Sequence, residues 1–279
     1  MPKTQFHDGC NALIYWFSLF ASVVAGQDSP LDRSDAKQND SKSLMGYVER
    51  VEVRIAGTEQ PVKAIPRPLF TYADQVRHIA EGGIWAWGDG RPVAMIKSWR
   101  NPDGRRTRAF SLTSEDLITV HGPQSLLWRP GNIQVAPRPL QNAGEPDRSE
   151  TGRLRQLKDQ ARRFSAYEMW DPENSRFEMR LLVQPVHRYQ DEQRQIIDGA
   201  VFLLAVDNNP QILLIIEMLA AEANGSRWQY LLGRVSSAEL HVALDGREVW
   251  AQNRTPGIIG RPTDPYWHMV TMPLGGNAP

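Results

Sequence analysis

The chain has 279 residues, of which 41% are apolar and 23% are charged, so it has room for one large or two small domains with a sizeable core. Lysine plus arginine and aspartate plus glutamate both number 32, and this balance argues against a nucleic-acid-binding protein, which normally carries a basic excess. The single cysteine, Cys10, lies in a segment that we expect to be removed. The mature chain would then have no thiol for a disulfide, a nucleophile or a metal site.

Residues 1–26 have the pattern of a signal peptide. Lys3 supplies a weakly basic start, and the apolar stretch 12–25 is followed by small residues. This stretch is shorter than the ~20 residues of a membrane-spanning helix. We therefore predict export to the periplasm or the exterior, with no membrane span after cleavage; an uncleaved N-terminal membrane anchor is the alternative. Residues 27–45 are almost devoid of apolar side chains and predict a flexible linker.

The rest of the chain contains an internal repeat. The segment RPLFTYADQVRHIAEGGIWAW (67–87) aligns with QPVHRYQDEQRQIIDGAVFLL (184–204) at a constant offset, and ordered matches continue to Trp128 and Trp250. An ordered series of this length rarely arises by chance, so it predicts two diverged copies of one unit. The predicted boundaries are copy one at 46–140, a linker and helix at 141–170, copy two at 171–255 and a C-terminal tail at 256–279.

The sequence pattern of each copy predicts a short antiparallel meander whose turns contain glycine or proline. In copy one the predicted strands are 62–65, 84–87, 93–99, 107–112 and 117–120, with a turn or short helix at 73–80. In copy two the run ILLII also suits a helix, because Asn209, Pro210 and Gly225 are typical of helix ends. Its match to the strand 93–99 favours a strand at 212–217, and its uninterrupted apolar side chains predict burial on both faces.

Between the copies, residues 153–167 predict a helix. Leu157, Ala161 and Phe164 form part of an apolar stripe, and Thr151 suits the N-cap. Basic side chains occupy the remaining surface, which is typical of a solvated connecting helix; contact with an anion or the cell envelope is the alternative. The predicted fold class is therefore all-β to α+β, with two related antiparallel β meanders in a sandwich or shared barrel and one bridging helix.

Three segments carry a resemblance to a known group of proteins. They are IWAWGDGRPVAMIK (84–97), RLRQLKDQARRFSA (153–166) and the stretches DGAVFLL and NPQILLIIE within 198–217. Together they resemble an uncharacterised family of exported proteins from planctomycete bacteria, over most of the mature chain. The resemblance implies export and a bacterial source, and it carries over no activity and no functional residue.

The sequence contains no strong catalytic or metal-binding motif. The histidines at 78, 121, 187, 241 and 268 lack metal-ligand spacing, and no G-x-S-x-G or glycine-rich phosphate loop occurs. We therefore predict no catalytic residue, no metal and no cofactor. His121 and His268 lie beside expected loops. An extracellular hydrolase of a polymer, using such a histidine with dispersed carboxylates, is the alternative function.

The most specific feature is a Tyr-x-Asp-x-x-Arg motif, which occurs once in each copy. Its residues are Tyr72, Asp74 and Arg77 in copy one and Tyr189, Asp191 and Arg194 in copy two. An aspartate and an arginine three residues apart can pair within a turn and fix how each meander enters its sheet. Retention in both copies favours this structural role over a carboxylate–guanidinium pair that grips a ligand.

Tryptophans of copy one are the candidate ligand-binding residues. Trp85, Trp87 and Trp99 correspond to Phe202, Leu204 and Glu217 in copy two. Trp85 and Trp87 project from one face of a strand, where they either contact a carbohydrate or a protein or fill the core between the copies. Together with the linker and the repeat, they favour a non-enzymatic exported or cell-envelope protein that binds an envelope protein or a polysaccharide.

Overall fold

The computed structural model describes residues 46–88, 90–122, 125–131, 135–223, 226–255 and 261–271. The predicted signal peptide, Cys10 and all of the predicted linker lie outside these residues. A short helix covers residues 46–49, helix α2 spans Glu150–Ala161, and most of the remaining regular structure is antiparallel strand. The predicted β-rich fold class is therefore confirmed.

The strands form three antiparallel sheets. The three-stranded sheet has the order β1 (Glu52–Ile55), β6 (Ile118–His121), β7 (Leu126–Trp128). The five-stranded sheet has the order β16 (Tyr266–Thr271), β5 (Arg106–Leu112), β4 (Ala94–Arg100), β3 (Ile79–Trp87), β2 (Phe70–Asp74). The eight-stranded sheet, which curls into a half-barrel, has the order β15 (Arg247–Gln252), β14 (Glu239–Leu244), β9 (Phe164–Met169), β10 (Phe177–Asp191), β11 (Ile196–Val206), β12 (Asn209–Ala223), β13 (Ser226–Arg234), β8 (Arg138–Pro139).

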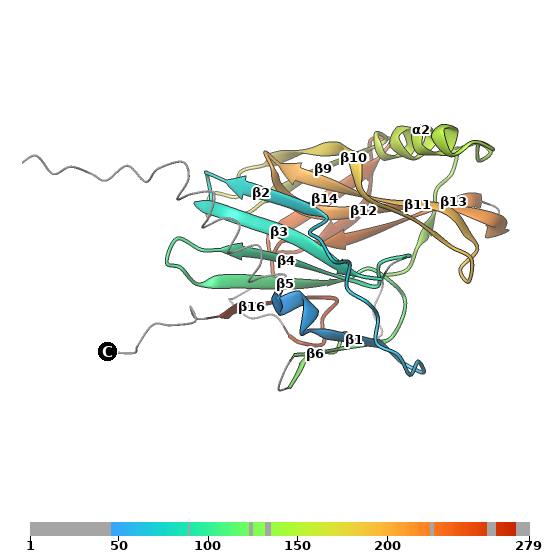
Figure 1. Cartoon of the computed structure of the whole chain (residues 1–279). Coiled ribbons are helices and arrows are strands. Elements are labelled where there is room, and N and C mark those ends of the chain that lie inside the picture. Colours follow the sequence, from blue (N-terminus) through green and yellow to red (C-terminus); the bar gives the residue numbers. More distant parts are fainter. Residues whose placement is uncertain are drawn as a thin grey trace, which may run out of the picture.

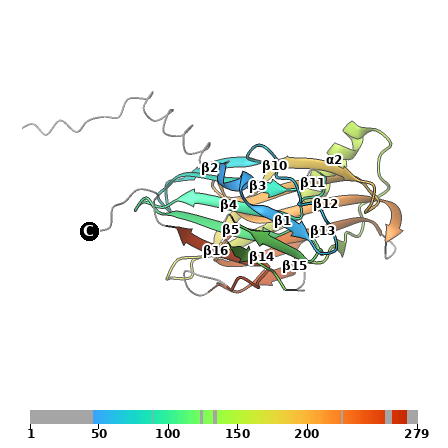
Figure 2. The same ribbon diagram turned by 60° about the horizontal axis from the view of Figure 1, so that its bottom comes forward.

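The sheets stack as layers, with the five-stranded sheet between the half-barrel and the three-stranded sheet (Figures 1 and 2). Because side chains alternate across a strand, each central strand contributes to two cores. In β12, Leu213 and Ile215 face the five-stranded sheet, whereas Leu214 and Ile216 pack inside the half-barrel in the cluster that includes α2. The strand predicted for this run, with burial on both faces, is confirmed.

The chain passes twice through the same order of elements. The short helix at 46–49 leads into β1–β7, which we call the first half, and α2 leads into β9–β15, the second half. The strand order β2-β3-β4-β5 is matched by β10-β11-β12-β13, and the order β1-β6-β7 is matched by β9-β14-β15. Registers agree too, since Tyr72 lies opposite Gly82 and Tyr189 opposite Gly199. The second half differs from the first because β9 also pairs with β10, and this pairing joins all the strands of the second half into one sheet.

Helix α2 differs from its prediction at both ends. Its N-cap is Ser149, whose hydroxyl accepts a hydrogen bond from a backbone N–H of the first turn, and not Thr151. It ends at Ala161, so Phe164 belongs to β9. Pairing of β9 with both β10 and β14 stabilises the extended conformation there and overrides the helical spacing of the apolar residues.

Two other segments depart from the expected elements. The predicted strand 62–65 is reduced to isolated bridges at Val62 and Ala64, because the flanking prolines Pro61 and Pro66 cannot donate to a ladder. Residues 266–271, within the predicted C-terminal tail, form β16 and pair with β5 along its length. Segment 266–271 therefore pairs with a strand of the first half.

The motif tyrosines lie over glycines of the neighbouring strand. A Cβ atom added to Gly199 would lie 2.6 Å from ring atoms of Tyr189. We expect Gly199→Ala to lower the free energy of unfolding by about 1–3 kcal/mol, because the buried ring must move to admit the methyl group. Urea unfolding followed by circular dichroism measures the loss. Gly46→Ala is the control, since its Cβ would lie 3.8 Å from the Arg50 side chain; equal losses in both variants would contradict this steric explanation.

Candidate functional site

The two Tyr-x-Asp-x-x-Arg motifs form matching turns. The Asp74 carboxylate accepts hydrogen bonds from the Arg77 backbone N–H at 2.9 Å and from its guanidinium at 3.2 Å. The Asp191 carboxylate accepts the same two bonds from Arg194, both at 3.0 Å. Each aspartate thus closes the turn between two strands, as the structural interpretation of the motif requires.

Each motif arginine also contacts a carboxylate of the other half. Arg77 of the first half donates to Glu168 of β9, and Arg194 of the second half donates to Asp116 at 2.7 Å. One guanidinium therefore joins a local turn to the opposite layer. These contacts place the motif at the interface between the halves.

A buried ion pair reinforces that interface beside the second motif. Arg91 Nε lies 2.6 Å from Glu217 Oε1, and the two side chains are 2% and 1% exposed. The Tyr189 hydroxyl donates to the same oxygen at 2.6 Å, and the Gln229 amide donates to the other carboxylate oxygen at 2.6 Å. A buried carboxylate satisfied in this way holds its partners in one arrangement.

A different polar cluster, centred on Lys97, adjoins the first motif. The Lys97 ammonium donates hydrogen bonds to Asn209 Oδ1 at 2.7 Å and to the Pro210 carbonyl at 2.5 Å. Burial lowers the pKa of Lys97 to about 7, and the nearby charge of Arg77 acts in the same direction. Burial likewise raises the pKa of the Glu168 carboxyl, although Arg77 opposes that change.

The predicted ligand-binding tryptophans lie in two different environments. Trp85 and Trp87 belong to the core between the five-stranded and three-stranded sheets and are 3% and 0% exposed. Trp99 is half-buried and lines a pocket of about 280 Å³ beside Lys97. Burial of Trp85 and Trp87 removes their ring faces from any surface ligand, so Trp99 is the member of this set that adjoins a pocket.

The buried carboxylates of the described chain are engaged by arginines. The salt bridges are Asp74 and Glu168 with Arg77, Asp198 with Arg153 and Arg188, and Glu217 with Arg91. His121 is the last residue of strand β6, next to the loop that begins at Gly122, as predicted, whereas His268 lies within strand β16. Within the described ranges, no three His, Cys, Asp or Glu side chains are placed to hold a metal ion.

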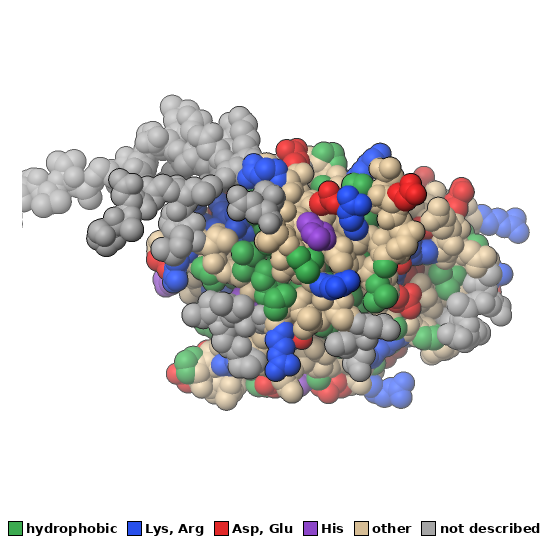
Figure 3. All heavy atoms as spheres, turned by 90° about the horizontal axis from the view of Figure 1, so that it is seen from below, with side chains coloured by type: hydrophobic (Ala, Val, Ile, Leu, Met, Phe, Trp, Pro, Cys, Tyr) green, Lys and Arg blue, Asp and Glu red, His purple; other side chains and the backbone are tan. Residues whose placement is uncertain are grey.

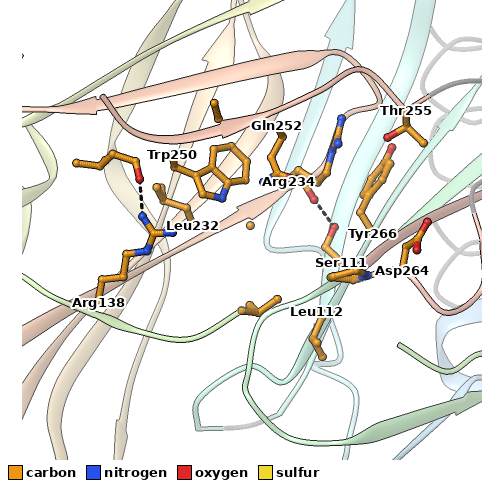
Figure 4. A pocket seen from close by; sticks show the side chains of 15 residues that line it. Ser111, Leu112, Arg138, Leu232, Arg234, Trp250, Gln252, Thr255, Asp264 and Tyr266 are labelled. Atoms are coloured by element: carbon orange, nitrogen blue, oxygen red, sulfur yellow. Dashed lines mark hydrogen bonds between the residues drawn. The ribbon is translucent and has the colours of Figure 1, made fainter. Parts of the chain in front are cut away.

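A cleft of about 510 Å³ lies where the half-barrel meets the five-stranded sheet (Figure 4). Strand β15 contributes Trp250 and β13 contributes Arg234. Strand β8 contributes Arg138 and β16 contributes Tyr266. Figure 4 shows these side chains around one open space, with residues from both halves of the chain.

The cleft exists because the half-barrel does not close by strand pairing. β15 is the terminal strand at one edge, and at the other edge β8 pairs with β13 at Gln229 and Tyr230 alone in the described chain. The Arg138 guanidinium donates to the Val249 carbonyl of β15 and so bridges the gap with a side chain. In the first half, by contrast, β16 covers the corresponding edge of β5 along its length.

The cleft arginines lack a carboxylate partner among the described residues. Arg234 donates to the carbonyl groups of Ser236, Ala238 and Asn253 at 2.8, 2.7 and 3.1 Å. Burial lowers the pKa of its guanidinium, since neutral carbonyl oxygens compensate a desolvated charge less well than a carboxylate does. The Tyr266 ring centroid lies 5.1 Å from the guanidinium carbon, and burial raises the pKa of its phenol. The cleft therefore presents two guanidinium groups that are not paired with a carboxylate of the described residues, and one carboxylate, Asp264, lies elsewhere on its wall (Figure 4).

Sequence reasoning did not single out the residues of this cleft. In the sequence, Trp250 is visible as the match of Trp128, yet Trp128 is fully buried whereas Trp250 is half-buried. The available signal was therefore the alignment of Trp250 with Trp128, which places Trp250 on β15, the terminal strand of the eight-stranded sheet. Arg138 and Arg234 are far apart in the sequence, and no local pattern indicates that they line one space.

The outer surface carries mixed charge. Figure 3 shows basic and acidic side chains interspersed over the described part of one face. This distribution agrees with the zero net charge and gives no stripe of the kind that nucleic acid requires on that face. Within the described chain, no helix has both the length and the apolar character needed to cross a bilayer.

Comparisons with protein-family models, with curated proteins and with solved structures gave no significant match. The cleft and the Lys97 pocket are therefore the features of the molecule from which a function can be inferred.

Proposed function

We propose that this chain is a non-enzymatic binding protein whose cleft, shown in Figure 4, holds an acidic oligosaccharide. The observation that carries the proposal is the placement of a half-buried indole, Trp250, with two guanidinium groups that have no carboxylate partner among the described residues. A desolvated positive charge on the wall of an open cleft favours an anionic ligand.

Size and chemistry of the cleft support this ligand class. Its volume of about 510 Å³ falls in the range of about 300–1,000 Å³ that is usual for small-ligand sites. The indole of Trp250 offers a flat apolar surface for a sugar ring, while Gln252 and Thr255 add hydrogen-bonding groups for hydroxyls. Guanidinium groups bind carboxylates in bidentate geometry. A sugar acid presents all three complementary features.

We also infer that the chain is exported and that its halves descend from one duplicated unit. The matched strand orders and registers support the duplication. The composition of residues 1–26 supports export. An envelope or extracellular polysaccharide is the source of acidic sugars that this location makes available.

Isothermal titration with short oligogalacturonates tests the proposal. We expect saturable binding that weakens as salt is raised, because charge screening reduces the contribution of the arginines. Trp250→Ala should weaken binding at least tenfold, as loss of a central aromatic contact typically does. Trp170→Ala is the matched control, since Trp170 is also half-buried but lies outside the cleft.

Three results would contradict the proposed function. One is the absence of binding for every acidic oligosaccharide tested with the folded protein. Another is equal affinity for neutral and acidic oligosaccharides, because the guanidinium groups of the cleft then play no part. The third is an equal loss of binding in Trp250→Ala and Trp170→Ala, which would place the ligand elsewhere.

A further inference from the structure

A second pocket is lined by Lys97 and Trp99 of β4 and by residues 235–238, which follow Arg234 in the chain. It has a volume of about 280 Å³. Lys97 lines it together with two indoles and two further cations, Trp99, Trp170, Arg77 and Arg254. Lys97 has no counterpart of its kind in the second half, where register places Ile215 at the matching position of β12.

The Lys97 amine differs from the cations Arg77 and Arg91, which lie at the same interface between the halves. Arg77 and Arg91 contact carboxylates directly, whereas the acceptors of Lys97 are the neutral oxygens of Asn209 and Pro210. No carboxylate of the described residues lies within ion-pair distance of the Lys97 nitrogen, although the side chain is only 3% exposed. An amine that is desolvated without an anionic partner is poorly held in its charged form.

We propose that Lys97 is a carbonyl-reactive amine and that its pocket admits a small aldehyde or 2-oxo acid. The indoles of Trp99 and Trp170 supply apolar walls. The Arg254 guanidinium, which donates to the carbonyl oxygens of Met169 and Asp171, favours a carbonyl compound that carries a carboxylate.

The reaction requires no oxidant or reductant. The lone pair of the neutral Lys97 nitrogen attacks the carbonyl carbon and forms a C–N bond, and a proton moves from nitrogen to oxygen to give a carbinolamine. The C–O bond then breaks, one water molecule leaves, and a C=N bond remains. The pKa of about 7 supports this step, because a large fraction of Lys97 is neutral at neutral pH whereas an ordinary lysine is almost wholly charged.

Reductive trapping tests the proposal in the intact folded protein. Glyoxylate is added with cyanoborohydride, which reduces an imine to a stable secondary amine, and modified lysines are located by peptide mass mapping. We expect Lys97 to be modified at least tenfold faster than Lys63, which is exposed, and Lys158, with a pH midpoint near 7. Acetaldehyde, which lacks a carboxylate, should react more slowly at Lys97 than glyoxylate does.

Modification of Lys63 and Lys158 without Lys97, or of Lys97 only in denaturant, would overturn the proposal. So would a rate at Lys97 that rises with pH in parallel with the rate at Lys63. Trp250→Ala should leave the trapping rate unchanged, since the two pockets do not share this residue. Trp250→Ala should therefore weaken oligosaccharide binding without slowing the trapping of Lys97, so the two proposals can fail independently.

Discussion

Arg91→Met is expected to lower the free energy of unfolding by about 3–5 kcal/mol, because it leaves the Glu217 carboxylate buried without its charged partner. The hydrogen bonds from Tyr189 and Gln229 remain, but neutral donors offset a buried charge only in part. Chemical denaturation monitored by circular dichroism measures the loss. The effect should be large because this pair also joins the two halves of the chain.

Two further variants distinguish an unpaired buried charge from other causes of lost stability. Arg91→Met combined with Glu217→Leu should recover most of the stability, since replacing both members of a buried pair by apolar residues is often neutral. Arg162→Met, which breaks the exposed pair of Arg162 with Asp159, should change stability little. If the double variant were as unstable as Arg91→Met, loss of packing rather than an unpaired charge would explain the result.

Stability of the wild-type protein is expected to rise relative to Lys97→Met by about 3 kcal/mol between pH ~7 and ~9.5. Burial lowers the pKa of Lys97 from 10.5 to about 7. In this window the unfolded chain holds a proton that the folded chain has released, so unfolding takes up a proton. The free energy of unfolding therefore increases with pH, and the increase ends as the unfolded lysine also loses its proton.

The upper limit of that window is set by buried phenols. Burial raises the pKa of Tyr72, Tyr189 and Tyr266, so above pH ~10 the unfolded chain releases phenol protons that the folded chain retains. That ionisation lowers stability with pH and opposes the lysine effect. Denaturation curves below pH ~9.5 avoid it. A constant stability difference between the wild-type protein and Lys97→Met across the window would show that Lys97 stays charged in the folded state.

Local sequence patterns predicted the elements whose conformation depends mainly on residues a few positions away in the chain. The two motif turns are examples, because Asp74 and Asp191 bond to residues three positions away. The strand at 212–217 is another, since its uninterrupted apolar side chains require cover on both faces and β12 has it. Alternation of buried residues in β3 placed Trp85 and Trp87 on one face, although it could not tell whether that face was covered.

The end of α2 shows where local pattern failed. Phe164 continues the apolar spacing of the helix, yet it starts β9 because partners from β10 and β14 pair with the segment. The energy of two strand pairings depends on residues far along the chain, which helical periodicity does not register. For the same reason the sequence did not indicate that 266–271 would pair with β5.

By itself the sequence determined a β-rich chain with turn motifs and apolar runs of defined burial, because these properties depend on neighbours a few positions apart. Tertiary structure alone decided which indoles remain accessible and which cations lack an anion. Trp250, Arg138 and Arg234 meet because the half-barrel leaves a gap between β15 at one edge and the paired strands β13 and β8 at the other. Lys97 is desolvated because Asn209 and Pro210 of the opposite layer cover it. The solvent accessibility of a side chain and the desolvation of its charge depend on all nearby atoms, so the packing of the layers determines both.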